Sequence, residues 1–153
     1  MDLAELIIAK GDNEDKDCPD GYYVDDMGYW VETDIRKDKA RYAEYILFRC
    51  LKKHAFYLIW NGALYTEHKE VYPTSQCINQ LADIPHAITY AQANWVYNRL
   101  RECAPTIDET KIYLGRGLVW DFSRGEVVNY KKNNFFTISG YKHETEKRDD
   151  ARG

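Results

Sequence analysis

Residues 55–71, with the sequence AFYLIWNGALYTEHKEV, decide the fold of this chain. Two runs rich in apolar and aromatic residues flank Asn61-Gly62, a pair that favours the positive φ angles of a two-residue type I′ turn. The stretch therefore predicts a β-hairpin with strands Ala55–Trp60 and Ala63–Val71. Counting outward from the turn pairs Trp60 with Ala63, Ile59 with Leu64, Leu58 with Tyr65, Tyr57 with Thr66, Phe56 with Glu67, and Ala55 with His68.

Amphipathic segments on both sides of this hairpin predict helices. Residues 36–53 carry one apolar stripe, with Asp34 as the expected N-cap. The basic residues of this segment fall on the opposite side: Arg41, Arg49, Lys52 and Lys53. We expect that side to be a solvated face, with an electrostatic docking face as the alternative.

The chain after the hairpin predicts a short helix or loop over residues 74–82 and then a long helix. Asp83 and Pro85 mark the expected start of the long helix, and Ala104-Pro105 stops it. From residue 111 onwards the pattern becomes strand-like, and short loops imply an antiparallel meander. Its expected strands are Ile112–Leu114, Leu118–Phe122, Glu126–Tyr130 and Phe135–Tyr141.

These elements predict a single α+β domain. Two main helices should pack on a mainly antiparallel sheet, in the order helix, β-hairpin, helix, β-meander. Residues 1–35 form an acidic, aromatic N-terminal arm, residues 36–141 the α+β body, and residues 142–153 a disordered tail.

Acidic residues are concentrated in the arm. Residues 1–35 hold eleven acidic residues against two lysines, a net charge of −9, although the chain of 153 residues has a formal net charge of −4. Such an arm could mask the basic body, imitate a polyanion or dock on a basic partner. The candidate partner-binding residues are its acidic and aromatic side chains: Asp15, Asp17, Asp20, Tyr22, Tyr23, Asp25, Asp26, Tyr29 and Trp30.

A weak catalytic constellation lies on the hairpin. The expected register brings Tyr57, Thr66 and His68 onto one face, where an imidazole beside hydroxyl groups could transfer protons. Arg116 would stabilise charge in such a site, and Tyr57, His68 and Arg116 are the candidate catalytic residues. A polar pair at the margin of a sheet is the simpler interpretation. Glu67 would have a raised pKa if buried against aromatics, but its expected place is the exposed end of the strand.

Arginines and lysines supply candidate anion or nucleic-acid contacts. Arg99, with Gln92 two helical turns before it, projects towards the expected core, so we predict a carboxylate near Arg99 or a path to the surface past Trp95. The remaining candidates lie on hairpin turns, where tyrosines and tryptophan could stack bases beside them: Arg116, Arg124, Lys131 and Lys132.

Familiar signatures of enzymes, metals and membranes are missing from the sequence. The four cysteines form no pair at metal-ligand spacing: Cys18, Cys50, Cys77 and Cys103. No nucleophile elbow, phosphate-binding loop, signal peptide or bilayer-spanning run is present. We expect a cytoplasmic protein without a cofactor or a metal.

These observations favour a binding or inhibitor protein that acts through protein–protein contacts with a basic partner surface. A virus- or mobile-element-type accessory factor against a host or defence protein fits this composition. The alternatives are a small nuclease or phosphoryl-handling enzyme with a His/Tyr/Arg site, and a nucleic-acid binder through the turn arginines. No membrane association is expected, and a homo-oligomer stays open.

Overall fold

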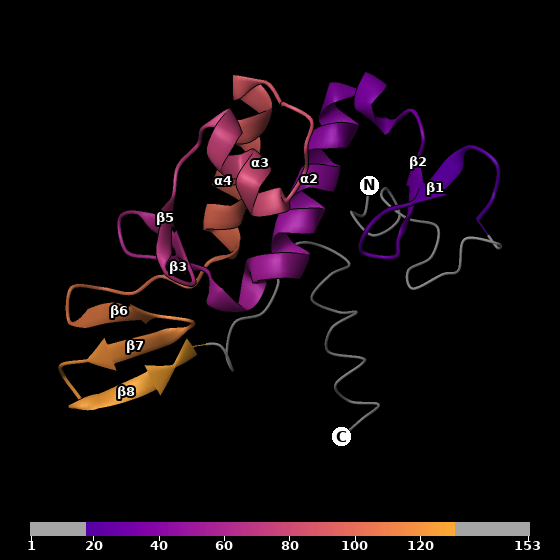
Figure 1. Cartoon of the computed structure of the whole chain (residues 1–153). Coiled ribbons are helices and arrows are strands. Elements are labelled where there is room, and N and C mark those ends of the chain that lie inside the picture. The colour runs from indigo at the N-terminus through magenta and orange to yellow at the C-terminus, as the bar shows by residue number, and fades with distance from the viewer. Residues whose placement is uncertain (1–17, 131–153) are drawn as a thin grey trace.

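The computed structural model describes residues 18–130 and confirms the predicted α+β class (Figure 1). Three helices form the centre of the domain: α2 (Lys39–His54), α3 (Ser75–Ala82) and α4 (Tyr90–Cys103). The β1–β2 hairpin lies beside α2, and the strands β6, β7 and β8 lie at the other end of the molecule (Figure 1).

The strands form three small antiparallel sheets rather than one. The first pairs β1 (Tyr22–Val24) with β2 (Trp30–Glu32). The second has the order β3 (Ile59–Trp60), β4 (Leu64–Thr66) and β5 (Lys69–Val71), and the third the order β6 (Lys111–Gly115), β7 (Leu118–Asp121) and β8 (Glu126–Asn129). Two short 3-10 helices, η2 (Ile35–Lys37) and η3 (Ala55–Tyr57), flank α2.

Both main helices begin later than the sequence predicts. The N-cap of α2 is Asp38, whose Oδ1 accepts hydrogen bonds from the backbone N–H groups of Ala40 and Arg41 at 3.1 and 3.2 Å. Asp34 is not the cap, because η2 occupies the turn that follows it. Asp83 does not start α4 but ends α3 in the left-handed conformation (φ 60°). Helix α4 begins only after Thr89, where a capping box satisfies its first N–H groups.

The predicted hairpin exists, but its register is wrong by one residue. Ile59 pairs with Tyr65 and Trp60 with Leu64, because Asn61, Gly62 and Ala63 form a three-residue loop instead of a two-residue turn. A shift of one residue moves every side chain to the other face of the strand. The strand predicted over Ala55–Trp60 is also shorter, since its first half forms η3.

A second turn divides the segment that the sequence predicts as one strand over Ala63–Val71. Glu67 and His68 form a tight turn between β4 and β5, where Thr66 pairs with Lys69 and Glu67 adopts a positive φ of 33°. Glu67 therefore does not lie opposite Phe56. The chain instead folds back and adds β5 as the outer strand of the sheet.

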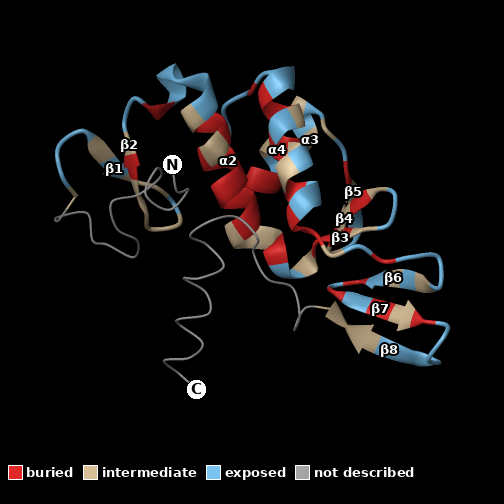
Figure 2. Cartoon of the chain, turned by 180° about the vertical axis from the view of Figure 1, so that it is seen from behind, coloured by how far each residue is buried: buried red, intermediate tan, exposed pale blue. Residues whose placement is uncertain are grey.

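The main core lies between the three helices and the small sheets around them. Buried residues, coloured red in Figure 2, gather on α2 and α4. In α4 the buried face contains Ala93, Val96 and Leu100, whereas Trp95 is 37% exposed. The buried stripe of α2 is wider than predicted and includes Phe48 and Arg49.

The predicted meander is confirmed for its first three strands, and residues 135–141 lie outside the described residues. A small second core anchors this sheet through Val119, Ile59 and Ile107, all buried. Two hydrogen bonds tie it to the rest of the domain: Tyr113 Oη donates to the Tyr57 carbonyl at 2.9 Å, and the Arg116 N–H donates to the Glu67 carbonyl at 2.9 Å.

Candidate functional site

One face of the β6–β7–β8 sheet is exposed and apolar. The pairing places Ile112, Trp120 and Val127 in one row across the three strands. The neighbouring positions on this side of β6 and β7 are also large apolar residues. We name this surface the meander face, and its members are Ile112, Leu114, Leu118, Trp120, Phe122 and Val127.

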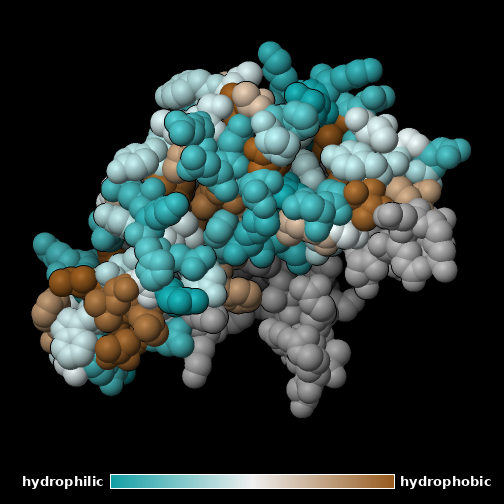
Figure 3. Space-filling model, in the orientation of Figure 1, coloured by the Kyte–Doolittle hydropathy of each residue, from teal (hydrophilic) through white to brown (hydrophobic). Residues whose placement is uncertain are grey.

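Most side chains of the meander face are exposed, and Trp120 is half-buried. Phe122 is 58% exposed, Leu114 52%, and Ile112 and Val127 each 50%, whereas Val119 on the opposite face is fully buried. Trp120 packs edge-on against Phe122, with ring centroids 6.2 Å apart. Brown, hydrophobic atoms gather over this sheet in Figure 3. An exposed apolar patch of this kind is typical of an interaction surface.

Charged residues border the meander face. Lys111 pairs with Asp108 at 3.5 Å, and Arg124 pairs with Glu126 at 3.3 Å. Arg116 lies exposed on the β6–β7 turn with a φ of 55°, and its guanidinium has no hydrogen bond or ion pair within residues 18–130. The structure therefore brings two of the predicted anion-binding residues, Arg116 and Arg124, to this sheet.

The other predicted anion-binding residues do not join them. Arg99 lies on α4, stacks over the Trp95 ring at 5.4 Å and approaches Glu102 at 3.8 Å. Its path past Trp95 and its neighbouring carboxylate both match the prediction. Gln92 is buried, and it does not join Arg99: its Nε2 donates a hydrogen bond to the Lys39 carbonyl at 3.0 Å. Lys131 and Lys132 lie outside the described residues.

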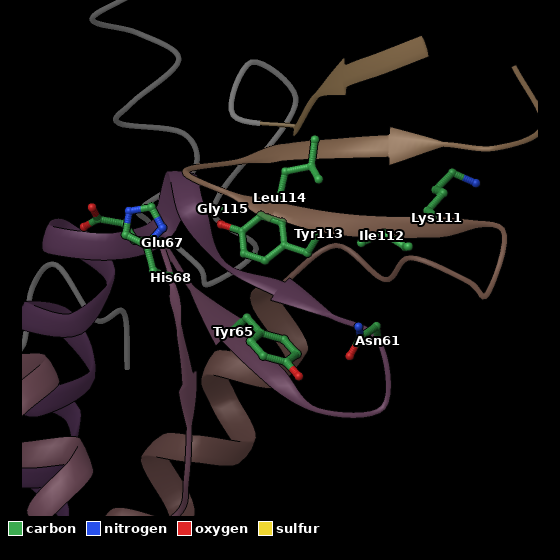
Figure 4. A pocket seen from close by; sticks show the side chains of 9 residues that line it. All are labelled: Asn61, Tyr65, Glu67, His68, Lys111, Ile112, Tyr113, Leu114 and Gly115. Atoms are coloured by element: carbon green, nitrogen blue, oxygen red, sulfur yellow. The ribbon is translucent and has the colours of Figure 1, made fainter. Parts of the chain in front are cut away.

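The predicted catalytic residues surround no single cavity. A hollow of about 360 Å³ lies between the β4–β5 turn and β6, and its lining includes Tyr65, Glu67, His68, Tyr113 and Gly115 (Figure 4). His68 comes so close to β6 that a Cβ on Gly115 would lie 2.7 Å from its Nδ1. Tyr57 and Arg116 do not line this hollow.

Among residues 18–130, no group in the hollow holds His68 in place by a hydrogen bond. A catalytic base is normally held by a hydrogen bond from a second group, as in the nucleophile–base–orienter arrangement of many enzymes. Within the described residues, neither His68 nor Glu67 has a side-chain hydrogen bond or ion pair. The rings of Tyr65 and Tyr113 both line the hollow, with centroids 6.2 Å apart and planes tilted by 52° (Figure 4).

The described part of the acidic arm packs on α2 rather than projecting from it. Arg49 binds both carboxylate oxygens of Asp26, at 2.6 and 3.1 Å, and approaches Asp25 at 3.4 Å. Tyr45 donates to Asp25 at 2.6 Å. These four residues form the arm network. The prediction that Arg49 lies on a solvated face is wrong, since it is 2% exposed.

Arg49 of the arm network also donates hydrogen bonds to two backbone carbonyl groups. The Nε and Nη2 groups of Arg49 donate to the carbonyl groups of Ala82 and Asp83, at 2.8 and 3.1 Å. The bond from Arg49 lowers the pKa of Asp26, while burial and the neighbouring Asp25 raise the pKa of Tyr45. The network thus joins the arm, α2 and the end of α3, which is a structural role.

The other arm residues differ in their exposure. Tyr29 packs edge-on against Phe48 at 5.0 Å between ring centroids, and Trp30 is half-buried. Asp20 is exposed, Tyr22 is half-buried and Tyr23 is 41% exposed. Asp15 and Asp17 lie outside the described residues. Of the predicted partner-binding set, Asp25 and Asp26 are thus bound to Arg49 within the chain, while Asp20 and Tyr23 face outward.

The sequence reasoning missed the meander face, although a signal for it was present. Residues 112–114 and 118–120 are apolar at consecutive positions, so both faces of these strands are apolar. A strand of that kind is covered on both sides in most proteins. Among residues 18–130, other elements of the domain cover only one side of this short meander.

Within residues 18–130, no group of three or more His, Cys, Asp or Glu side chains is arranged to hold a metal ion. None of the helices in that range is both long and apolar enough to cross a bilayer. Comparison with protein-family models, curated proteins and solved structures found no significant match. The functional argument therefore depends on the geometry of the chain itself.

Proposed function

We propose that this protein is a binding protein that acts through protein–protein contacts, and that a partner docks on the meander face. The observation that supports this most directly is the row Ile112, Trp120 and Val127, extended by Phe122 and Leu114 on an exposed sheet. Singly scattered apolar residues are normal on a protein surface, but contiguous patches mark interaction sites. Aromatic anchors such as Trp120 and Phe122 are enriched at the centres of such interfaces.

The border of this face suggests the chemistry of the partner. Arg116 is the bordering cation whose guanidinium has no ion pair among the described residues, since Lys111 and Arg124 have local carboxylates. The partner surface that fits best is therefore apolar at its centre, with a carboxylate placed to reach Arg116. This differs from the basic partner that the acidic arm alone would suit.

A second copy of this chain fits less well than a different protein. In a twofold dimer, the same patch meets itself, so each Arg116 needs a carboxylate from the other copy's border. The nearby carboxylates Asp108 and Glu126 are already paired with Lys111 and Arg124. We propose that a different protein binds the meander face, and that this chain inhibits that partner by binding it there.

The test is capture of partners with the full chain from lysate of the native host, followed by affinity measurement with the recovered protein. The variant Phe122→Glu/Val127→Glu places two charges on the meander face. We expect it to lose at least about 100-fold in affinity, since interface anchors are typically worth about 2 kcal/mol each. The matched control is Tyr90→Glu, because Tyr90 is 71% exposed on α4, away from this sheet.

Three results would count against the proposal. They are binding by the double variant at the wild-type level, an equal loss in the Tyr90→Glu control, and a wild-type dimer that becomes monomeric in the double variant. Circular dichroism should first show that both variants are folded.

The acidic arm is a second candidate binding surface, and its test needs a deletion shorter than residues 1–35. Deletion of residues 1–35 would remove Asp25 and Asp26 and expose Arg49, so the loss of binding would have two explanations. Deletion of residues 1–17 removes Asp15 and Asp17 but leaves the arm network in place. If this shorter deletion abolishes capture while the meander-face variant keeps it, the arm is the binding surface.

A further inference from the structure

The loop between β3 and β4 carries the one Asn-Gly pair of the sequence, Asn61-Gly62. Both residues are exposed, and Asn61 is among the residues that line the hollow beside β6 (Figure 4). Gly62 has a φ of 101°, and among residues 18–130 no atom outside the loop lies within 4 Å of the place that a Cβ would occupy. The Gly62 peptide therefore has room to move, and no side chain of its own hinders approach to its nitrogen.

The Asn61 side chain is turned back over the peptide that follows it. Its Oδ1 accepts a hydrogen bond from the Ala63 N–H at 3.3 Å, and the Asn61 N–H donates to the Ala63 carbonyl at 3.1 Å. Asparagine commonly forms such a bond with the residue two positions on. Because the Gly62 nitrogen lies along the chain between the two bonded groups, the bond folds Cγ of Asn61 towards that nitrogen.

This arrangement suits an attack of the Gly62 nitrogen on Cγ of Asn61. A bond forms between these two atoms, the bond from Cγ to Nδ2 breaks, and Nδ2 leaves as ammonia with the proton that the Gly62 nitrogen gives up. Water then opens the resulting five-membered succinimide at either carbonyl, which yields aspartate or isoaspartate. Negative charge develops on Oδ1 during the attack, where the Ala63 N–H already donates, and such a donor stabilises the transition state.

The other asparagines among residues 18–130 lie in regular elements. Asn79 is on α3, Asn94 and Asn98 are on α4, and Asn129 is on β8, and each is followed by a residue with a side chain. Asn79 and Asn98 also donate from Nδ2 to backbone carbonyl groups, at 2.9 and 3.0 Å. Ring closure at these positions requires the helix or strand to open first, whereas the exposed loop at Asn61 needs no such opening.

We propose that Asn61 is a site of spontaneous deamidation through a succinimide, with water as the second reactant. The conversion adds a negative charge to the loop, and the isoaspartate form also adds one carbon to the main chain. The change lies next to Trp60, whose N–H donates to the Pro105 carbonyl at 2.9 Å and whose carbonyl accepts from the Ile107 N–H at 2.8 Å. These two bonds join the hairpin to the segment that leads into β6. Asn61 is not part of the meander face, so this inference is independent of the proposed docking there.

The test incubates the folded, full-length protein in mildly alkaline buffer and follows its tryptic peptides by mass spectrometry. Trypsin releases residues 54–69 as one peptide, in which Asn61 is the sole side-chain amide, so a gain of one mass unit there is assigned to Asn61. The peptide of residues 70–99 carries Asn79, Asn94 and Asn98 as internal controls. We expect Asn61 to deamidate at least about tenfold faster than these three, and to yield both aspartate and isoaspartate.

A variant of the attacking residue tests the succinimide route. Gly62→Ala places a methyl group beside the nitrogen and should slow deamidation of Asn61 by about tenfold. The matched control is Gly125→Ala, which should leave the rate at Asn61 unchanged: Gly125 also has a positive φ, of 64°, and open space for a Cβ, but it follows Arg124. Circular dichroism should first show that both variants are folded.

Three findings would overturn the inference. They are equal rates at Asn61 and the three control asparagines, a rate at Asn61 that Gly62→Ala leaves unchanged, and a product that is aspartate alone. The last finding would indicate direct hydrolysis of the side-chain amide, which gives no isoaspartate.

Discussion

Replacement of Arg49 by methionine should destabilise this protein strongly, because it leaves a carboxylate buried without a cation. The Asp25 side chain is 4% exposed and the Arg49 side chain 2%. Removal of one member of a buried ion pair typically costs about 3–5 kcal/mol. A domain of this size has a free energy of unfolding of about 5–15 kcal/mol, so the variant loses a large share of it.

A matched surface pair provides the control for this effect. Arg124 and Glu126 are 3.3 Å apart, but their side chains are 65% and 53% exposed. Exposed pairs contribute about 0–1 kcal/mol, so Arg124→Met should change the stability little. The two variants remove the same charge and add the same side chain, and they differ mainly in burial.

The measurement is thermal unfolding at pH 7, monitored by tryptophan fluorescence. We expect Arg49→Met to lower the melting temperature by roughly 10 °C, since 1 kcal/mol corresponds to about 2–4 °C at this chain length. Adding Asp25→Asn to Arg49→Met should recover part of the loss, because the amide carries no charge. The reasoning is refuted if Arg49→Met costs no more than Arg124→Met, or if the second substitution makes the loss larger.

Two further predictions concern local geometry and pH. In thermal unfolding, Gly115→Ala should lower the melting temperature by more than Gly125→Ala. Both glycines have positive φ angles, but of the two only Gly115 would bring a Cβ to 2.7 Å from Nδ1 of His68. Equal losses in the two variants would contradict this close approach. The bond from Arg49 lowers the pKa of Asp26, so its stabilising contribution is present above the ordinary value of 3.8 and is lost as the pH falls through the lower folded-state value. Melting temperatures measured between pH 5 and pH 2 should therefore fall less steeply in Asp26→Asn than in the wild type, and parallel curves would show that this bond contributes nothing.

Local patterns in the sequence were enough to find most elements of the fold. The meander strands, the hairpin around Asn61-Gly62 and the body of α2 lie where their periodicity predicts them. Their exact limits depended on competing local bonds. Asp38 rather than Asp34 caps α2 because η2 occupies the residues that follow Asp34, and the loop at Asn61 takes a third residue.

The candidate sites were predicted less well, because they depend on contacts between distant residues. The catalytic group built on Tyr57 and His68 required both residues to lie on paired strands, but Tyr57 lies in η3 and His68 in the turn between β4 and β5. Arg99 was predicted better, since Trp95 and Glu102 lie within one turn of it on α4. Contacts within one helix can be read from spacing, whereas cross-strand contacts require the register.

The sequence by itself determined where the elements lie, that the fold is α+β, and that the arm carries the excess of acidic residues. Hydrophobic period, turn residues and charge counts are local properties, so they can be read along the chain. Only the tertiary structure decided that Asp25 and Asp26 neutralise Arg49, 23 or more residues away, and that one face of the meander is left exposed by the other described residues. The free energy of burying a charge or an apolar face depends on what packs against it, and that is set by the whole fold.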